Sequence, residues 1–144
     1  MGVKKDLVKE VELVNIYDES HEIGQSIKVH NDINCCSVAT LSCVTDLSFN
    51  HCNLYLRRFG RRHRKGMPMT EVIKSLEMFT RYHVEDLGYH HGERITLGRF
   101  LKLYPKGRYY CCVREHSFAV IDGVVYDHSL GLRRQIVMAY QIRD

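Results

Sequence analysis

A cysteine, a histidine and an aspartate of this sequence together form the set of groups that nucleophilic catalysis requires. The cysteine, Cys35, opens an apolar segment over 35–44 that is followed by no charged residue before Asp46. A helix that is apolar on nearly every side belongs in a protein core. The macrodipole and the free amides at the start of such a helix favour a thiolate. We therefore expect Cys35 to be a nucleophile at the N-terminus of a buried helix.

The histidine and the aspartate, His116 and Asp127, flank an Asp122-Gly123 dipeptide, which is a strong signal for a two-residue β-hairpin turn. Such a turn fixes the register, so that residue 121 faces 124, 120 faces 125, 118 faces 127 and 116 faces 129. Asp127 is then the diagonal neighbour of His116, within reach of its imidazole, and Ser129 is its direct partner. The hairpin is predicted to present a histidine oriented by a carboxylate.

These three groups predict acyl transfer by a thiol. His116 would withdraw the proton of Cys35, the thiolate would attack a carbonyl, and water would release the acyl group. The backbone amide of Cys35 and the side chain of Asn34 or Asn31 are the available donors for the oxyanion. We expect no cofactor and no metal. Cys52 with His51 and His63, or the His90-His91 pair, stay open as metal ligands but lack a recognisable spacing.

The elements that must position these groups are predicted as helices first and strands afterwards. Helices are expected over 35–44 and 49–59, after Thr70 as an N-cap, and over 97–104 with Thr96 as an N-cap. Strands are expected over 108–121, 124–128 and 133–142, with a short segment at 82–87. Residues 1–30 are expected to form an extended or capping segment with a turn at Gly24. The predicted fold class is α+β, with a core helix packed against an antiparallel sheet.

Composition limits the class of protein. The chain has 144 residues, a net charge of +4, 44% hydrophobic residues and six cysteines, which predicts a single domain over 1–144 and excludes disorder throughout. No uncharged apolar run approaches the ~20 residues of a membrane span, and charged residues interrupt the first fourteen positions, so we expect neither membrane binding nor a secretory signal. The location is therefore expected to be cytoplasmic, with reduced cysteines. Cys43, Cys52 and Cys111 are expected to be small buried hydrophobes.

A basic run interrupts the first half of the chain, and no acidic residue occurs between Asp46 and Glu71. Such a run is a solvated loop, or it binds phosphates or an acidic surface. Gly60 and Gly66 would make it flexible, as suits a substrate-binding flap. The alternative function is thus a catalytically inactive protein that binds a host protein or nucleic acid through this run. Its members are Arg57, Arg58, Arg61, Arg62, Arg64 and Lys65.

Three segments resemble small papain-fold cysteine peptidase-like proteins of bacteriophages and bacteria. They are Asn-Cys-Cys-Ser-Val-Ala-Thr-Leu at 34–41, Thr-Leu-Gly-Arg-Phe-Leu-Lys-Leu-Tyr-Pro-Lys-Gly-Arg-Tyr at 96–109 and Arg-Glu-His-Ser-Phe-Ala-Val-Ile-Asp-Gly-Val-Val-Tyr-Asp at 114–127. The resemblance covers 31–130 and implies a single papain-like domain with Cys35, His116 and Asp127 as its triad. Cys35 rather than Cys36 is favoured because Ala39 follows it by four residues. Where papain-like enzymes carry a glutamine, about six residues before the nucleophile, this chain has Val29.

The activity that the resemblance implies is a thiol hydrolase that cleaves a peptide, isopeptide or related amide bond of a peptide or protein substrate. A bacteriophage product of this kind would act in the cytoplasm of the host cell. A transferase that passes through the same acyl-enzyme stays open, since its first chemical step is identical.

Overall fold

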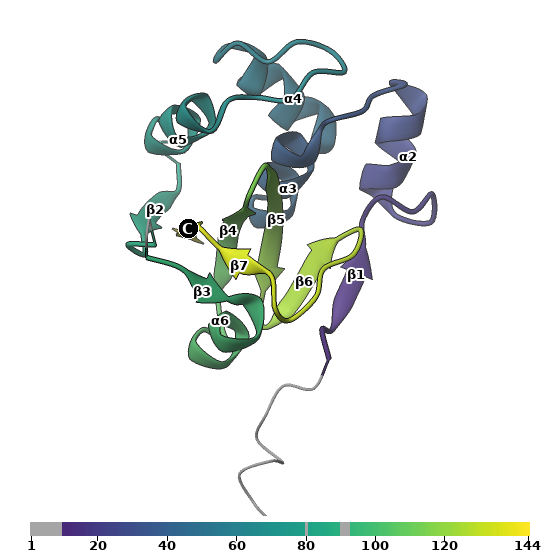
Figure 1. Ribbon diagram of the computed structural model, residues 1–144. Helices are drawn as coiled ribbons and strands as arrows, with labels where there is room; N and C mark the ends of the chain where they lie inside the picture. Colours follow the sequence, from purple (N-terminus) through teal and green to yellow (C-terminus); the bar gives the residue numbers. More distant parts are fainter. Residues whose placement is uncertain (1–9, 80, 90–92) are drawn as a thin grey trace, which may run out of the picture.

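A six-stranded sheet forms the middle of the molecule, and Figure 1 shows it with helices α2 to α5 towards one end and α6 towards the other. The computed structural model describes residues 10–79, 81–89 and 93–144. The first nine residues of the expected N-terminal segment and the His90-His91 pair lie outside the described residues. Within the described part of the chain, no helix has the length and apolar character needed to cross a bilayer.

The sheet has the strand order β1-β6-β5-β4-β8-β2, and only its β1–β6 pairing is parallel. A mostly antiparallel sheet that accompanies five helices among the described residues confirms the α+β class. In the order of the sheet, the strands are β1 (Leu13–Asn15), β6 (Val124–Asp127), β5 (His116–Ile121), β4 (Arg108–Val113), β8 (Met138–Arg143) and β2 (His83–Asp86). A second, two-stranded sheet pairs β3 (Ile95–Thr96) with β7 (Gln135–Ile136).

Each face of the six-stranded sheet carries a hydrophobic core. Tyr110 and Cys112 of β4 pack in a cluster with residues of α2 (Glu22–Val29), α3 (Cys36–Val44), α4 (Phe49–Arg57) and α5 (Met69–Glu77). Tyr109 and Cys111 instead join a cluster with α6 (Leu97–Leu103). Because side chains alternate along a strand, the two adjacent cysteines of β4 are buried in different cores.

Helix α3 is the predicted core helix, and it begins one residue later than expected. Its residues carry no charge, and most of them are buried. They pack against the neighbouring helices and against strands β4 and β5. Cys35 is the N-cap residue, with φ −110° and ψ 26°, and its side chain makes no capping hydrogen bond. The first helical residue is therefore Cys36.

The hairpin that carries the histidine and the aspartate has the predicted register. Asp122 and Gly123 both have positive φ values, 48° and 80°, as a type I′ turn requires. The ladder pairs Ile121 with Val124 and Val120 with Val125, and it extends to the pair of residues 119 and 126.

Three predicted elements differ from the structure. The strand expected over 108–121 is two strands, because Arg114 and Glu115 form an exposed turn in which Glu115 has φ 61°. The strand expected over 133–142 is divided into β7 and β8. Helix α5 starts at Met69 with Pro68 as its N-cap, not after Thr70, since proline presets its own φ and needs no partner for a backbone N–H.

The N-terminal segment is more structured than expected, since it contains β1 and α2, and Gly24 lies inside α2 rather than at a turn. A Cβ at Gly24 would lie 2.0 Å from the backbone oxygen of Asp18. The absence of a side chain at this position therefore allows the 18–21 turn to pack against the helix.

Gly24→Ala is expected to lower the free energy of unfolding by about 1–3 kcal/mol, because the backbone of Asp18 would have to move. Urea denaturation followed by circular dichroism measures the change. Gly131→Ala is the matched control, since a Cβ there meets no atom of the described chain within 4 Å, and we expect a change within about 0.5 kcal/mol. Equal denaturation midpoints for the two variants would contradict this packing argument.

Candidate active site

His116 and Asp127 form a hydrogen-bonded pair at the sheet end of the site, as the hairpin register predicts. Nε2 of His116 lies 2.8 Å from Oδ1 and 2.9 Å from Oδ2 of Asp127. The Asp127 side chain is 1% exposed, whereas that of His116 is 32% exposed. A carboxylate only accepts hydrogen bonds, so Nε2–H is the donor and Nδ1 is the ring nitrogen left for another partner.

That partner is Cys36, and not the expected Cys35. The Cys36 sulfur interacts with the His116 ring and with the backbone N–H of Ser117, and both interactions favour its thiolate by lowering the pKa of the thiol. Cys36 and His116 also line the same cleft. Adjacent helical side chains point about 100° apart. The residue at which α3 begins therefore decides which of the two sulfurs faces the imidazole. Since Cys35 is the N-cap and Cys36 the first helical residue, it is the second of the two sulfurs that meets the imidazole.

The contact between Cys36 and His116 shifts the pKa values of both side chains in the direction that favours their charged forms. Burial opposes ionisation of Cys36, but the hydrogen bonds from His116 and Ser117 and the positive charge of the ring outweigh it, so the pKa of this thiol lies below its ordinary value. The hydrogen bonds of His116 to Asp127 and Cys36 raise the pKa of the imidazole to about 9 against the opposing effect of burial. Both shifts favour a thiolate next to an imidazolium.

The other five cysteines are shifted in the opposite direction. Burial, followed by the negative charge of Asp32, raises the pKa of Cys35 to about 11. Burial also raises the pKa values of Cys43, Cys52 and Cys112 to about 12 and that of Cys111 well above its ordinary value. Cys52 and Cys111 are fully buried as expected, and Cys43 is partly buried. Cys36 is thus the one cysteine of this chain that its surroundings activate.

A cleft of about 920 Å³ opens beside Cys36 and His116. Most of its lining is apolar, and Glu115 and His128 add polar groups. A substrate carbonyl that enters the cleft would approach the Cys36 sulfur along a mostly apolar surface. The apolar side chains that line the cleft include Ile27, Ile33, Met67, Met69 and Val72.

Of the two expected side-chain donors for the oxyanion, Asn34 lines the cleft and Asn31 does not. The Nδ2 of Asn34, however, donates to the backbone oxygen of Arg64 at 3.3 Å. The backbone oxygen of Asn31 accepts from the Arg64 guanidinium. Val29, at the position of the family glutamine, is 80% exposed at the end of α2.

Two other kinds of donor lie at the cleft. The first N–H groups of a helix have no partner inside the helix, and in α3 the amide of Ala39 makes the first bond, to Cys35. Tyr17 also lines the cleft; burial, followed by the charge of Cys36, raises the pKa of its hydroxyl, which therefore stays a donor. No motif marked Tyr17 in the sequence, because it stands alone in a polar segment.

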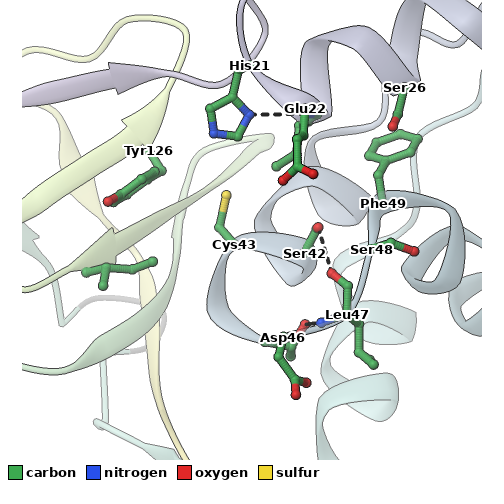
Figure 2. Close-up of a pocket in the computed structure, with 13 residues that line it drawn as sticks. His21, Glu22, Ser26, Ser42, Cys43, Asp46, Leu47, Ser48, Phe49 and Tyr126 are labelled. Atoms are coloured by element: carbon green, nitrogen blue, oxygen red, sulfur yellow. Dashed lines mark hydrogen bonds between the residues drawn. The ribbon is translucent and has the colours of Figure 1, made fainter.

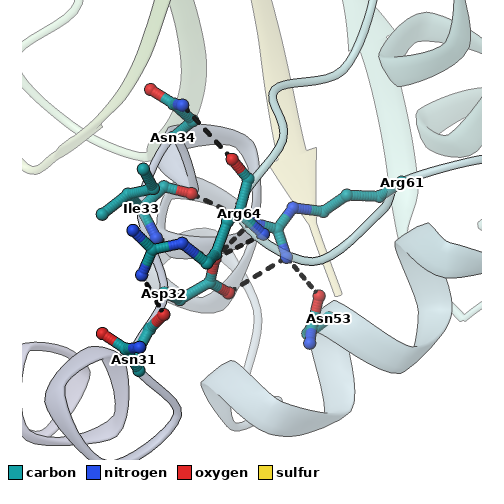
Figure 3. A network of polar contacts seen from close by, with 7 residues as sticks. All are labelled: Asn31, Asp32, Ile33, Asn34, Asn53, Arg61 and Arg64. Atoms are coloured by element: carbon teal, nitrogen blue, oxygen red, sulfur yellow. Dashed lines mark hydrogen bonds and ion pairs between the residues drawn. The ribbon is translucent and has the colours of Figure 1, made fainter.

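Two expected binding features have other places in the structure. Ser129 is exposed and lines a separate depression with Leu130 and Leu132. Within the basic run, Arg61 is buried in an ion pair with Asp32 (Figure 3), so it is not available to a ligand. The physical reason is that its guanidinium satisfies a carboxylate that would otherwise be buried without a counter-charge. Four members of the run are exposed: Arg57, Arg58, Arg62 and Lys65.

A second pocket, of about 530 Å³, lies beside the opposite end of α3 (Figure 2). His21 caps α2 through its Nδ1, which accepts from the Ile23 amide, and Asp46 accepts from Arg81 and Tyr82. Its cysteine, Cys43, is one of those with a raised pKa. The pocket therefore contains no activated nucleophile.

No protein-family model, curated protein or solved structure matches this chain. The fold and the site by themselves define an α+β protein in which a helix N-terminus presents a cysteine to a histidine–aspartate pair on a β-hairpin.

Proposed function

We propose that this protein is a thiol hydrolase of papain-like fold that cleaves a peptide, isopeptide or related amide bond. The observation that supports the proposal most directly is the contact of Cys36 with His116, at the wall of an apolar cleft. Cys36 is the nucleophile, His116 the acid and base, and Asp127 the group that orients the ring. The arrangement of a cysteine-bearing core helix on an antiparallel sheet that carries the histidine agrees with the papain-like architecture.

The reaction proceeds in two halves. The Cys36 thiolate attacks the carbonyl carbon, the C=O π electrons move to the oxygen, and the helix amides stabilise the oxyanion. The imidazolium of His116 then donates its proton to the leaving amine as the C–N bond breaks, which leaves a thioester on Cys36. Water gives a proton to His116 and attacks the thioester, and the acid is released with the thiolate restored. A transferase differs only in using an amine instead of water in the second half.

The proposed setting follows the chemistry. Six free cysteines are typical of a protein in a reducing compartment, so the proposal places the protein in the cytoplasm of a host cell, with a peptide or protein as its substrate and no cofactor. The alternative, a non-catalytic protein that binds a host protein or nucleic acid, rests on the exposed cations Arg57, Arg58, Arg62 and Lys65. It predicts a biological effect that survives loss of the Cys36 sulfur.

A peptidyl acyloxymethyl ketone tests the proposed function, because it alkylates thiolates that are placed to attack an acyl carbonyl. We expect one adduct by intact mass and its location on Cys36 by peptide mapping. The absence of an adduct, or its distribution over several cysteines of the folded protein, would end the hydrolase proposal.

The pH dependence of hydrolysis is expected to be bell-shaped, with an acid limb below the ordinary pKa of a thiol and an alkaline limb near 9. The acid limb reports ionisation of Cys36, whose pKa is lowered. The alkaline limb reports loss of the proton that His116 must give to the leaving amine, since its pKa is raised to about 9. The measurement is kcat/KM against pH with a peptide substrate selected from a fluorogenic library. A profile that keeps rising beyond pH 10 would contradict the role of His116 as the acid.

A further inference from the structure

A buried ion pair joins the loop that leads into α3 to the loop that follows α4. The guanidinium of Arg61 donates from Nη2 to Oδ1 of Asp32 at 2.9 Å and from Nη1 to Oδ2 at 3.1 Å. Both side chains are 0% exposed. Arg61 also donates to Oδ1 of Asn53 in α4 at 2.6 Å and to the backbone oxygen of Ile33 at 3.4 Å. Figure 3 shows Asp32 and Asn53 converging on the same guanidinium.

The ion pair belongs to a network that joins two loops far apart in the sequence. The backbone amide of Arg64 donates to Oδ1 of Asp32 at 3.1 Å, and its guanidinium donates to the backbone oxygen of Asn31 at 2.7 Å. The amide of Asn34 returns a bond to the backbone oxygen of Arg64. We call this network the brace; its members are Asn31, Asp32, Ile33, Asn34, Asn53, Arg61 and Arg64.

The brace includes three residues in the left-handed backbone conformation. Asn31, Asn34 and Arg64 have φ values of 50°, 53° and 64°. Asparagine adopts such values more readily than most residues, whereas arginine does so only where the surrounding contacts impose them. The conformation of Arg64 therefore depends on the polar bonds between the loops, which its backbone amide and its guanidinium both make.

Both loops of the brace continue into the walls of the cleft. Ile33 and Asn34 line the cleft and lead directly to Cys35, the N-cap of α3. On the other loop, Gly66 to Met69 line the cleft two residues beyond Arg64. Any change in the distance between the loops therefore changes both the width of the cleft and the direction in which α3 begins.

We infer that the Asp32–Arg61 ion pair is a positioning device that aims Cys36 at His116 and keeps the two walls of the cleft at a fixed separation. For catalysis, this inference rests on the proposed role of Cys36. An ion pair of this kind has little advantage in stability over apolar side chains of similar volume. Arg61 Nε is moreover buried without a hydrogen-bond partner in the described chain, so stability alone does not explain the arrangement.

The double variant Asp32→Leu/Arg61→Met tests the inference, because it replaces the buried charges by apolar side chains and leaves neither charge unpaired. We expect a folded protein by circular dichroism in which Cys36 reacts with iodoacetamide at pH 7 about tenfold more slowly, as for a rise of one unit in the pKa of the thiol. The pKa of His116, followed by NMR of its ring protons, should fall below about 9. The matched control is Glu85→Gln/Arg143→Met, which removes an exposed 2.8 Å arginine–carboxylate contact between β2 and β8; both readouts should stay unchanged.

Asn34→Gly provides a second variant that leaves no buried charge unpaired and accepts a positive φ. It removes one bond between the loops, and we expect the same changes at a smaller size. If both variants fold and leave the pKa of His116 and the pH profile of alkylation as in the wild type, the inference is overturned; if the double variant does not fold, Asn34→Gly decides alone. Slow alkylation of Cys36 in the wild type would instead end the hydrolase proposal, and the titration of His116 would still decide the role of the brace.

Discussion

Replacement of Cys36 by alanine is expected to remove the fast reaction of this protein with iodoacetamide at pH 7, whereas replacement of Cys35 should leave it intact. Alkylation requires the thiolate, and only Cys36 has a pKa below its ordinary value. With a pKa of about 11, Cys35 is ionised to about one part in 10⁴ at pH 7. A time course of labelling, followed by digestion and mass spectrometry, measures each cysteine separately.

The urea-unfolded protein is the reference for this experiment, because all six cysteines then react as ordinary thiols. In the folded protein, Cys36 should react faster than its own unfolded reference and the other five cysteines more slowly. Fast labelling of Cys35 that persists in Cys36→Ala would restore the assignment made from the sequence. Hydrolysis or probe labelling should disappear in Cys36→Ala, and the variant should remain folded because only a small side chain is lost.

Asp127→Ala is expected to lower the pKa of His116 and to raise the pKa of Cys36. Without the carboxylate, the hydrogen bond that contributes most to the raised pKa of His116 is lost, and burial then moves that pKa from about 9 towards or below its ordinary 6.5. The ring is neutral at pH 7 and no longer stabilises the thiolate, so the pKa of Cys36 should return towards 9.0 or above. The thiolate fraction at pH 7 then falls to about 1% or less, and iodoacetamide labelling slows with it.

The same variant should change how stability depends on pH. Because the folded pKa of His116 lies above the unfolded value, its stabilisation is fully present below pH 6.5 and is lost as the pH rises through about 9. The stabilisation is at most about 3 kcal/mol, and solvent at the partly exposed ring reduces it. Urea midpoints measured from pH 5 to 10 should show this decline in the wild type and a flatter curve in Asp127→Ala.

Asp127→Asn separates charge from orientation, since the amide oxygen can still accept from Nε2 of His116. We expect labelling of Cys36 at a rate between those of the wild type and Asp127→Ala. A rate equal to the wild type in both variants would show that the carboxylate neither orients nor charges the ring.

The sequence determined the parts of the site that depend on neighbours along the chain. The uncharged segment up to Val44 specifies a core helix, because no polar face is available to point towards water. The Asp122-Gly123 turn sets the register of the hairpin, because few residue pairs adopt its two positive φ values. From that register alone, His116 and Asp127 are expected within hydrogen-bonding reach, and they are.

Only the tertiary structure decided which cysteine meets the histidine. A shift of one residue at the start of α3 turns the side chains by about 100°, and the start depends on the brace, whose partners lie about 30 residues apart in the chain. The burial of Arg61 and the place of Tyr17 at the cleft also depend on distant contacts. Local preferences act through the backbone over a few residues, whereas these features depend on how separate segments pack, and no local pattern encodes that.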